Sequence, residues 1–131
     1  MKRLLSFLVL SFLLAGCRPT YKDWSQDWNR VFQGYMTGDV VTAKAALLQE
    51  EKLVAEHEAR GNRGVDFVVV RTVLYTQLCG ISDYMGQTND ARLYYQKYLA
   101  VSPKNTKTYA ELIAADKKED DLLKPKWRER K

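Results

Sequence analysis

Residues 65–86 read VDFVVVRTVLYTQLCGISDYMG and decide the fold, since they are the most apolar part of the chain beyond its N-terminal segment. Their apolar positions step by three and four residues, as on one face of a helix. These positions are Phe67, Val70, Leu74, Leu78, Ile81 and Met85. Val69 and Val73 widen the stripe, which predicts a helix at the centre of the core. The valine triplet 68–70 has high β-propensity and leaves a strand over 66–71 as the alternative, but the continued stepping favours the helix.

Four further helices are predicted around this central one, because apolar residues recur at helical spacing between turn signals. Their expected ranges are 24–37, 40–60, 88–101 and 106–123. The first carries Trp24, Trp28, Val31, Phe32 and Tyr35 on one stripe. The sequence therefore predicts an all-α domain over 24–123, with about five helices arranged as antiparallel hairpins.

Residues that favour helix N-termini stand at three of the expected boundaries. Asp39 precedes the second helix, and either Thr88 or Asn89 is placed to cap the fourth. Thr108 and Glu111 have the spacing of a capping box before the last helix.

Residues 72–105 carry a set of large, small and turn residues at regular spacing. The set is Tyr75, Leu78, Cys79, Gly86, Ala91, Tyr95 and Pro103. It resembles the tetratricopeptide repeat, a helix–turn–helix unit of about 34 residues, although Ser82 and Tyr98 depart from the family pattern. A degenerate second unit is predicted over 24–60. Such units bury their faces poorly when there are fewer than about three, so the alternative is an irregular bundle of four or five helices.

The resemblance implies a binding surface, because the first helix of each unit in this family lines a concave groove that holds peptides or partner helices. Carried over by spacing, the partner groove consists of Val73, Thr76, Gln77, Gly80, Asp83 and Tyr84. The degenerate unit adds Trp28, Asn29, Phe32, Tyr35 and Met36, of which the aromatic residues also have core spacing. Since glycine has no side chain, we expect a partner backbone to approach closely at Gly80.

The N-terminus predicts where the protein resides. Met1-Lys2-Arg3 is basic, and the apolar run 4–14 is far shorter than the roughly 20 residues of a membrane-spanning helix. Leu14-Ala15-Gly16-Cys17 resembles the lipobox of bacterial lipoproteins, which implies a lipid on the Cys17 thiol and cleavage after Gly16. An ordinary secretory signal is the alternative.

The lipoprotein reading predicts a signal peptide over 1–16 and a lipidated tether over 17–23. It places the protein in the bacterial cell envelope, anchored to the membrane through Cys17. Because Arg18 rather than aspartate follows the cysteine, we expect the inner leaflet of the outer membrane if the organism has two membranes.

Charge is concentrated at the C-terminus. Without residues 1–16 the chain holds 19 basic and 16 acidic residues, and residues 124–131 alone carry a net +4. A near-neutral domain of this kind argues against nucleic-acid binding. The tail suits an anionic lipid surface, and a solvated, mobile terminus is the alternative. The predicted membrane-contacting residues are Lys124, Lys126, Trp127, Arg128, Arg130 and Lys131.

No sequence pattern predicts a catalytic site, a metal site or a cofactor. His57 lacks partners at a suitable spacing and is expected on the solvated face of its helix. Glu50-Glu51 and the charged run 116–121, with Asp120-Asp121, are expected to be solubilising. Cys79 lies on the core stripe and is predicted to be a buried packing residue.

We therefore expect a non-enzymatic, lipid-anchored envelope protein that binds a protein or peptide partner through a helical groove. Two alternatives remain from the sequence. One is a structural lipoprotein that holds the membrane by its lipid and its basic tail, and the other is an envelope enzyme of unrecognised type.

Overall fold

The computed structural model describes residues 18–104 and 106–129, and within these ranges the chain is helical without a strand. The predicted signal peptide and Cys17 lie outside the described residues. The elements are α2 (Tyr21–Thr37), α3 (Val40–Ala59), α4 (Phe67–Tyr84), α5 (Thr88–Val101), α6 (Tyr109–Leu123) and the short 3-10 helix η1 (Lys126–Arg128). The predicted all-α class with five helices is confirmed.

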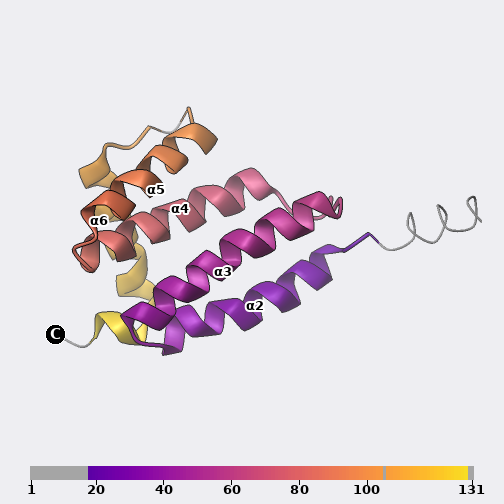
Figure 1. The fold of residues 1–131 in the computed structure, drawn as a ribbon, viewed down its shortest axis with the longest axis horizontal. Helices are drawn as coiled ribbons and strands as arrows, with labels where there is room; N and C mark the ends of the chain where they lie inside the picture. Colours follow the sequence, from indigo (N-terminus) through magenta and orange to yellow (C-terminus); the bar gives the residue numbers. More distant parts are fainter. Residues whose placement is uncertain (1–17, 105, 130–131) are drawn as a thin grey trace, which may run out of the picture.

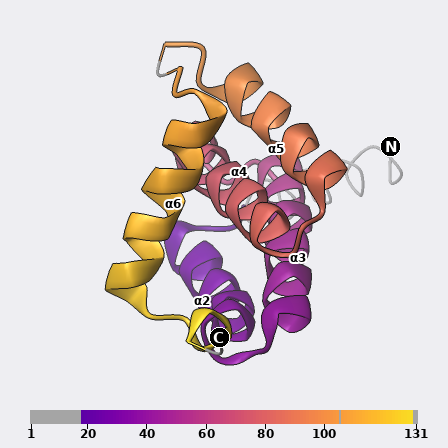
Figure 2. The same cartoon turned by 90° about the vertical axis from the view of Figure 1, so that its left-hand side faces the viewer.

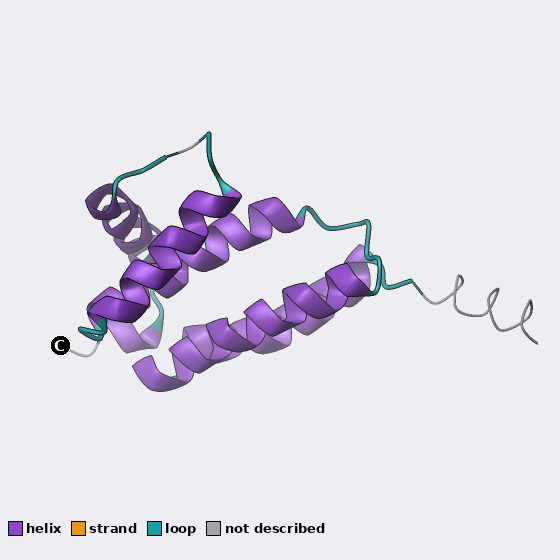
Figure 3. Ribbon diagram, turned by 45° about the horizontal axis from the view of Figure 1, so that its top comes forward, coloured by secondary structure: helices purple, strands orange, loops and turns teal. Residues whose placement is uncertain are grey.

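Two antiparallel hairpins, α2–α3 and α4–α5, form the body of the fold, and α3 packs against α4 (Figures 1 and 3). Because each turn reverses the chain, α2 and α4 run in the same direction. Figure 2 shows α6 crossing beside α4 on its way from α5 toward α2, with η1 beyond its end. Contacts of α6 with α4, and of η1 with α2 and α3, hold the C-terminus against both hairpins.

The helix over residues 67–84 replaces the strand alternative because Asp66 caps it. The Asp66 carboxylate accepts hydrogen bonds from the backbone N–H groups of Val68 and Val69 at 3.1 and 3.2 Å. These bonds satisfy donors that a helix start leaves without partners. The local cap therefore outweighs the β-propensity of the valines.

Of the three predicted caps, two are confirmed and one is wrong. Asp39 accepts from the N–H of Thr42, and Thr108 with Glu111 forms the expected capping box. The first residue of α5 is Thr88, so its N-cap is Gln87, which makes no side-chain capping bond.

The predicted tether over 17–23 is too long. Thr20 and Asp23 form a capping box, which starts α2 at Tyr21 rather than at residue 24. Pro19 is buried, and the carbonyl of Thr20 accepts from Asn62. The ordered domain therefore begins within a few residues of Cys17.

The centre of the core lies on α4 as predicted. Leu74, Leu78, Cys79 and Ile81 are fully buried there. Three valines in the first half of α4 are not buried: the exposed fractions of Val68, Val69 and Val73 are 59%, 57% and 42%. The predicted widening of the stripe is therefore a solvent-facing apolar surface.

The alternative of a solvated terminus is wrong for Pro125 and Trp127, which are buried. Trp127 is 3% exposed, and its ring meets the rings of Tyr35 and Tyr84 edge-on at 5.9 and 5.0 Å. Lys124 adopts a left-handed conformation at the end of α6, which turns the chain back onto the bundle. Lys124 and Lys126 are exposed, whereas Arg130 and Lys131 lie outside the described residues.

Candidate functional site: an apolar groove that holds a buried carboxyl group

The predicted partner groove runs between α2 and α4, but α6 closes one end of it. A Cβ atom added at Gly80 would lie 1.8 Å from Asp116 Oδ2 on α6. Gly80 therefore makes room for the chain's own last helix, which occupies the space that a partner backbone would need. The expectation of an open approach at Gly80 is wrong.

The closure is held by a buried polar cluster, which we define as Tyr35, Asp116, Asp120 and Arg128. Arg128 donates to Asp116 Oδ2 at 3.0 Å and, through Nε, to Asp120 Oδ2, while the Tyr35 hydroxyl donates to Asp120 Oδ1. Both aspartates are at most 2% exposed. The prediction that residues 116–121 are solvated is therefore wrong for these two.

Burial and the neighbouring negative charge of Asp120 raise the pKa of Asp116 to about 8, against the opposing effect of Arg128. Burial likewise raises the pKa of the Tyr35 hydroxyl. The guanidinium of Arg128 also lies 4.8 Å from the centre of the Trp127 ring. These contacts give the basic tail a structural task, and they leave neither Trp127 nor Arg128 free to meet a membrane.

Asp83 and Tyr84, which were predicted to line the partner groove, border a separate hollow of ≈ 490 Å³ beside α6. The Tyr109 hydroxyl donates to Asp83 Oδ1 at 2.7 Å, so this carboxylate already has a partner. Thr76 is half-buried and its hydroxyl bonds to the carbonyl of Thr72. These three residues therefore lie apart from the open end of the predicted groove.

The open end is a depression of ≈ 500 Å³, which we call the apolar groove. On α2 it is lined by Tyr21, Trp24, Trp28 and Phe32. On α4 and the turn before it, the lining is Val65, Val69, Val70, Val73 and Gln77. Glu50 of α3 also borders it, and Glu119 and Leu123 of α6 close its far end. Val73 and Gln77 of the predicted partner groove are thus brought together with Trp28 and Phe32 of the degenerate unit.

Regular helical spacing builds both walls. Residues 24, 28 and 32 repeat every four positions on α2, as do residues 69, 73 and 77 on α4. At 1.5 Å per residue, the stretch from Tyr21 to Phe32 is about 16 Å long. The rings of Trp28 and Phe32 stack with their centres 4.5 Å apart, which gives this wall a flat aromatic face. The asparagine at position 29 and the methionine at 36 do not line the groove.

Glu50 is the polar group that sequence reasoning missed. Its side chain was expected in solvent but is 4% exposed, and its Oε1 accepts from Trp28 Nε1 at 3.1 Å. Burial raises the pKa of this carboxyl to about 7. The adjacent Glu51 points elsewhere and pairs with Lys97 at 3.2 Å.

The charges that border the apolar groove all have one sign. Besides Glu50 they are Asp66 and Glu119, and among the described residues that line the groove there is no lysine, arginine or histidine. Aromatic and aliphatic walls with acidic groups make a surface suited to an apolar segment that carries positive charge.

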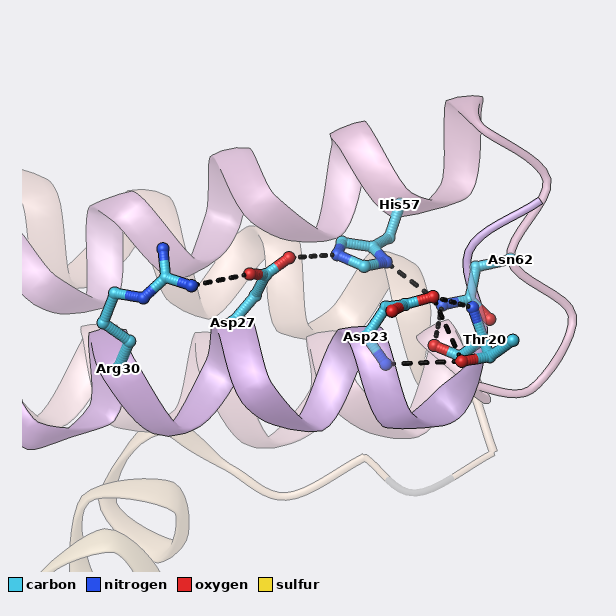
Figure 4. Close-up of polar contacts among 6 residues, drawn as sticks. All are labelled: Thr20, Asp23, Asp27, Arg30, His57 and Asn62. Atoms are coloured by element: carbon cyan, nitrogen blue, oxygen red, sulfur yellow. Dashed lines mark hydrogen bonds and ion pairs between the residues drawn. The ribbon is translucent and has the colours of Figure 1, made fainter. Parts of the chain in front are cut away.

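His57 was expected on the surface, yet it is 1% exposed and sits in a hydrogen-bonded chain (Figure 4). Its Nε2 lies 2.9 Å from Asp27 Oδ2, and its Nδ1 lies 3.1 Å from Asn62 Nδ2. Because the amide N–H of Asn62 can only donate, Nδ1 accepts and Nε2–H donates to Asp27. One ring nitrogen therefore holds α3 to α2 and the other holds α3 to the turn that follows it, which favours a structural role over catalysis.

Other reactive groups are similarly constrained. Cys79 is fully buried, as predicted, and burial raises its pKa to about 12, which suppresses the thiolate. Across residues 18–104 and 106–129, no group of three or more acidic, histidine or cysteine side chains is placed to hold a metal ion. Nor does that part of the chain contain a helix long and apolar enough to cross a membrane.

Comparison of the chain with protein-family models, with curated proteins and with solved structures gave no match. We therefore infer the candidate site from the geometry described above.

Proposed function

We propose that this protein is a lipid-anchored module of the bacterial envelope, which binds a segment of a partner protein in the apolar groove. The observation that carries the proposal is the groove itself, where Tyr21, Val69 and Val73 are exposed. Between them Trp28 and Phe32 are partly exposed. An exposed apolar patch with a polar rim is typical of an interaction surface.

The geometry of the groove favours a helical occupant. Helical segments dock into apolar grooves through side chains that repeat every three or four residues. The side chains that line the two walls of the groove also repeat every four residues. The chain's own α6 offers a precedent, since it is a helix that packs against α4 at the closed end (Figure 2). We infer that the two hairpins act in the manner of tetratricopeptide-like units, with α6 as a terminal helix.

The position of the groove suits an anchored protein. Tyr21 at its mouth follows the lipobox cysteine by four residues, a distance of at most about 14 Å of extended chain. If Cys17 carries lipid, the groove is held close to the bilayer surface. It would therefore meet partners that are themselves membrane-bound or close to the membrane.

Two neighbouring valines allow a matched test. Val69 lines the apolar groove and is 57% exposed, whereas Val68 is 59% exposed and lies outside it. The full-length protein, with Cys17 intact, is used to capture partners from membranes. We expect Val69→Lys to lose the partners that the wild-type protein captures and Val68→Lys to keep them. Equal capture by the two variants would exclude the groove as the binding site.

A further inference from the structure

Glu50 occupies a position that apolar packing does not explain. Its carboxyl group is almost fully buried at the base of the groove, yet of the described residues only Trp28 gives it a hydrogen bond, and none forms an ion pair with it. Removing a carboxylate from water without a cationic partner is costly. The carboxyl group is thus buried without a charged partner among the described residues, and it borders the apolar groove.

We propose that Glu50 is a cation-recognition site, which receives the ammonium or guanidinium group of a lysine or arginine on the apolar face of the partner's helix. This inference rests on the proposed function, since it names the chemistry of the segment that the groove binds. The partner is thereby specified as an amphipathic helix with a basic residue inside its apolar stripe.

The surroundings of Glu50 favour a cation over a neutral donor. The Trp28 Nε1–H meets the carboxylate with the edge of the ring, and this hydrogen bond favours the charged form of Glu50 and so opposes the rise of its pKa. The other charged groups at the rim, Asp66 and Glu119, are acidic and reinforce the attraction. A long lysine or arginine stem can pack along the valines of α4 while its charged end reaches Glu50.

A lysine or arginine also fits the dimensions of the groove. Its walls span about three helical turns, and Glu50 on α3 borders the groove between α2 and α4. A docked helix can therefore place aliphatic residues on either side of one central cation. The resulting ion pair would be shielded from solvent, where charge–charge coupling is strong.

The test uses three peptides about 15 residues long, which share an alanine–leucine helix with one leucine stripe. At the centre of the stripe they carry lysine, glutamine or glutamate, and they contain no tryptophan. Their binding to the wild-type protein and to Glu50→Gln is followed by tryptophan fluorescence, since Trp24 and Trp28 line the groove. Glutamine keeps an oxygen for the Trp28 bond, so the variant should fold. Glu51→Gln is the matched control, because it removes a neighbouring charge outside the groove.

We expect the lysine peptide to bind the wild-type protein and Glu51→Gln about tenfold more tightly than the glutamine peptide, and the glutamate peptide to bind most weakly. In Glu50→Gln the preference for lysine should fall to about one. An unchanged preference in Glu50→Gln, or no binding of the lysine peptide to the wild-type protein, would overturn the inference. Capture of partners by Glu50→Gln, together with its loss in Val69→Lys, would refute the cation site while leaving the proposed function standing.

Discussion

Replacing Gly80 with alanine should destabilise the protein, because the added methyl group collides with α6. The new Cβ would lie 1.8 Å from Asp116 Oδ2 and 2.4 Å from its Cγ. The carboxylate would have to retreat by about 1.6 Å to reach the 3.4 Å at which ordinary contact begins. Asp116 is 1% exposed and bonded to Arg128 at 3.0 Å, so it cannot retreat without disturbing the buried polar cluster.

The expected magnitude follows from two opposing effects. Alanine in place of glycine favours a helix interior by about 1 kcal/mol. Overpacking a tight contact costs about 1–3 kcal/mol, and disturbing a buried ion pair raises the cost further. We expect the free energy of unfolding to fall by about 2 kcal/mol. If α6 did not cover Gly80, only the helix preference would remain and the same substitution would be stabilising.

Equilibrium urea unfolding, followed by circular dichroism, measures this change in a soluble form of the protein that lacks residues 1–16 and carries Cys17→Ser. Gly34→Ala is the control, since its Cβ meets a single methyl group of Ala46 at 3.1 Å, and its effect should stay within about 1 kcal/mol of zero. Adding Asp116→Ala should relieve part of the Gly80→Ala defect. A stabilised Gly80→Ala protein would refute the placement of α6.

Three further predictions concern groups that the fold buries. Burial raises the pKa of Glu50 from 4.5 to about 7 in the folded state, so folding favours the protonated carboxyl group. The free energy of unfolding of the wild-type protein should therefore fall by about 3 kcal/mol relative to that of Glu50→Gln as pH rises from 4.5 through 7. Parallel pH–stability curves for the two proteins would contradict this. Trp127→Ala should destabilise the fold by about 3 kcal/mol, whereas a mobile tail would give no change in urea unfolding. Cys79, which is fully buried, should react with a thiol reagent only in denaturant, and rapid labelling of the native protein would show that α4 is turned outward.

The helices could be predicted from the sequence because they depend on local signals. The stepping of apolar residues through Met85 and the caps at Asp39 and Thr108 identify α3, α4 and α6 from neighbouring residues alone. The errors in helix ends are also local. Thr20 and Asp23 have the spacing of a capping box, and this box starts α2 at Tyr21 and not at residue 24.

The candidate site was predicted only in part, because burial of polar groups depends on tertiary contacts. Glu50 and Asp116 lie on helix faces that look solvated in sequence, and each becomes buried when another element covers it. His57 follows the same rule, since its partners Asp27 and Asn62 lie 30 residues before it and five after it. A connector that contains Asn62 between two glycines was the one available signal that this turn is built around a side chain.

The dependence of burial on tertiary contacts also explains what the sequence could not predict about the groove and the tail. The structure brings Val73 and Gln77 together with Trp28 and Phe32 in the lining of one depression. Spacing could not show that α6 folds over Gly80, because that contact joins residues 36 positions apart and depends on the buried polar cluster. The basic composition of residues 124–131 pointed to solvent or lipid, whereas the packing of Trp127 and Arg128 is a tertiary property.

The central claim is that the apolar groove binds a partner protein, and site-specific photocrosslinking in intact membranes tests it most directly. A photoreactive amino acid is placed at Val73 in the groove or at Val68 outside it, in the full-length protein with Cys17 intact. We predict a defined crosslinked partner at position 73 that disappears when Val69→Lys is added, and no such product at position 68. Crosslinks of equal yield at both positions, or a product at 73 that survives Val69→Lys, would contradict the claim.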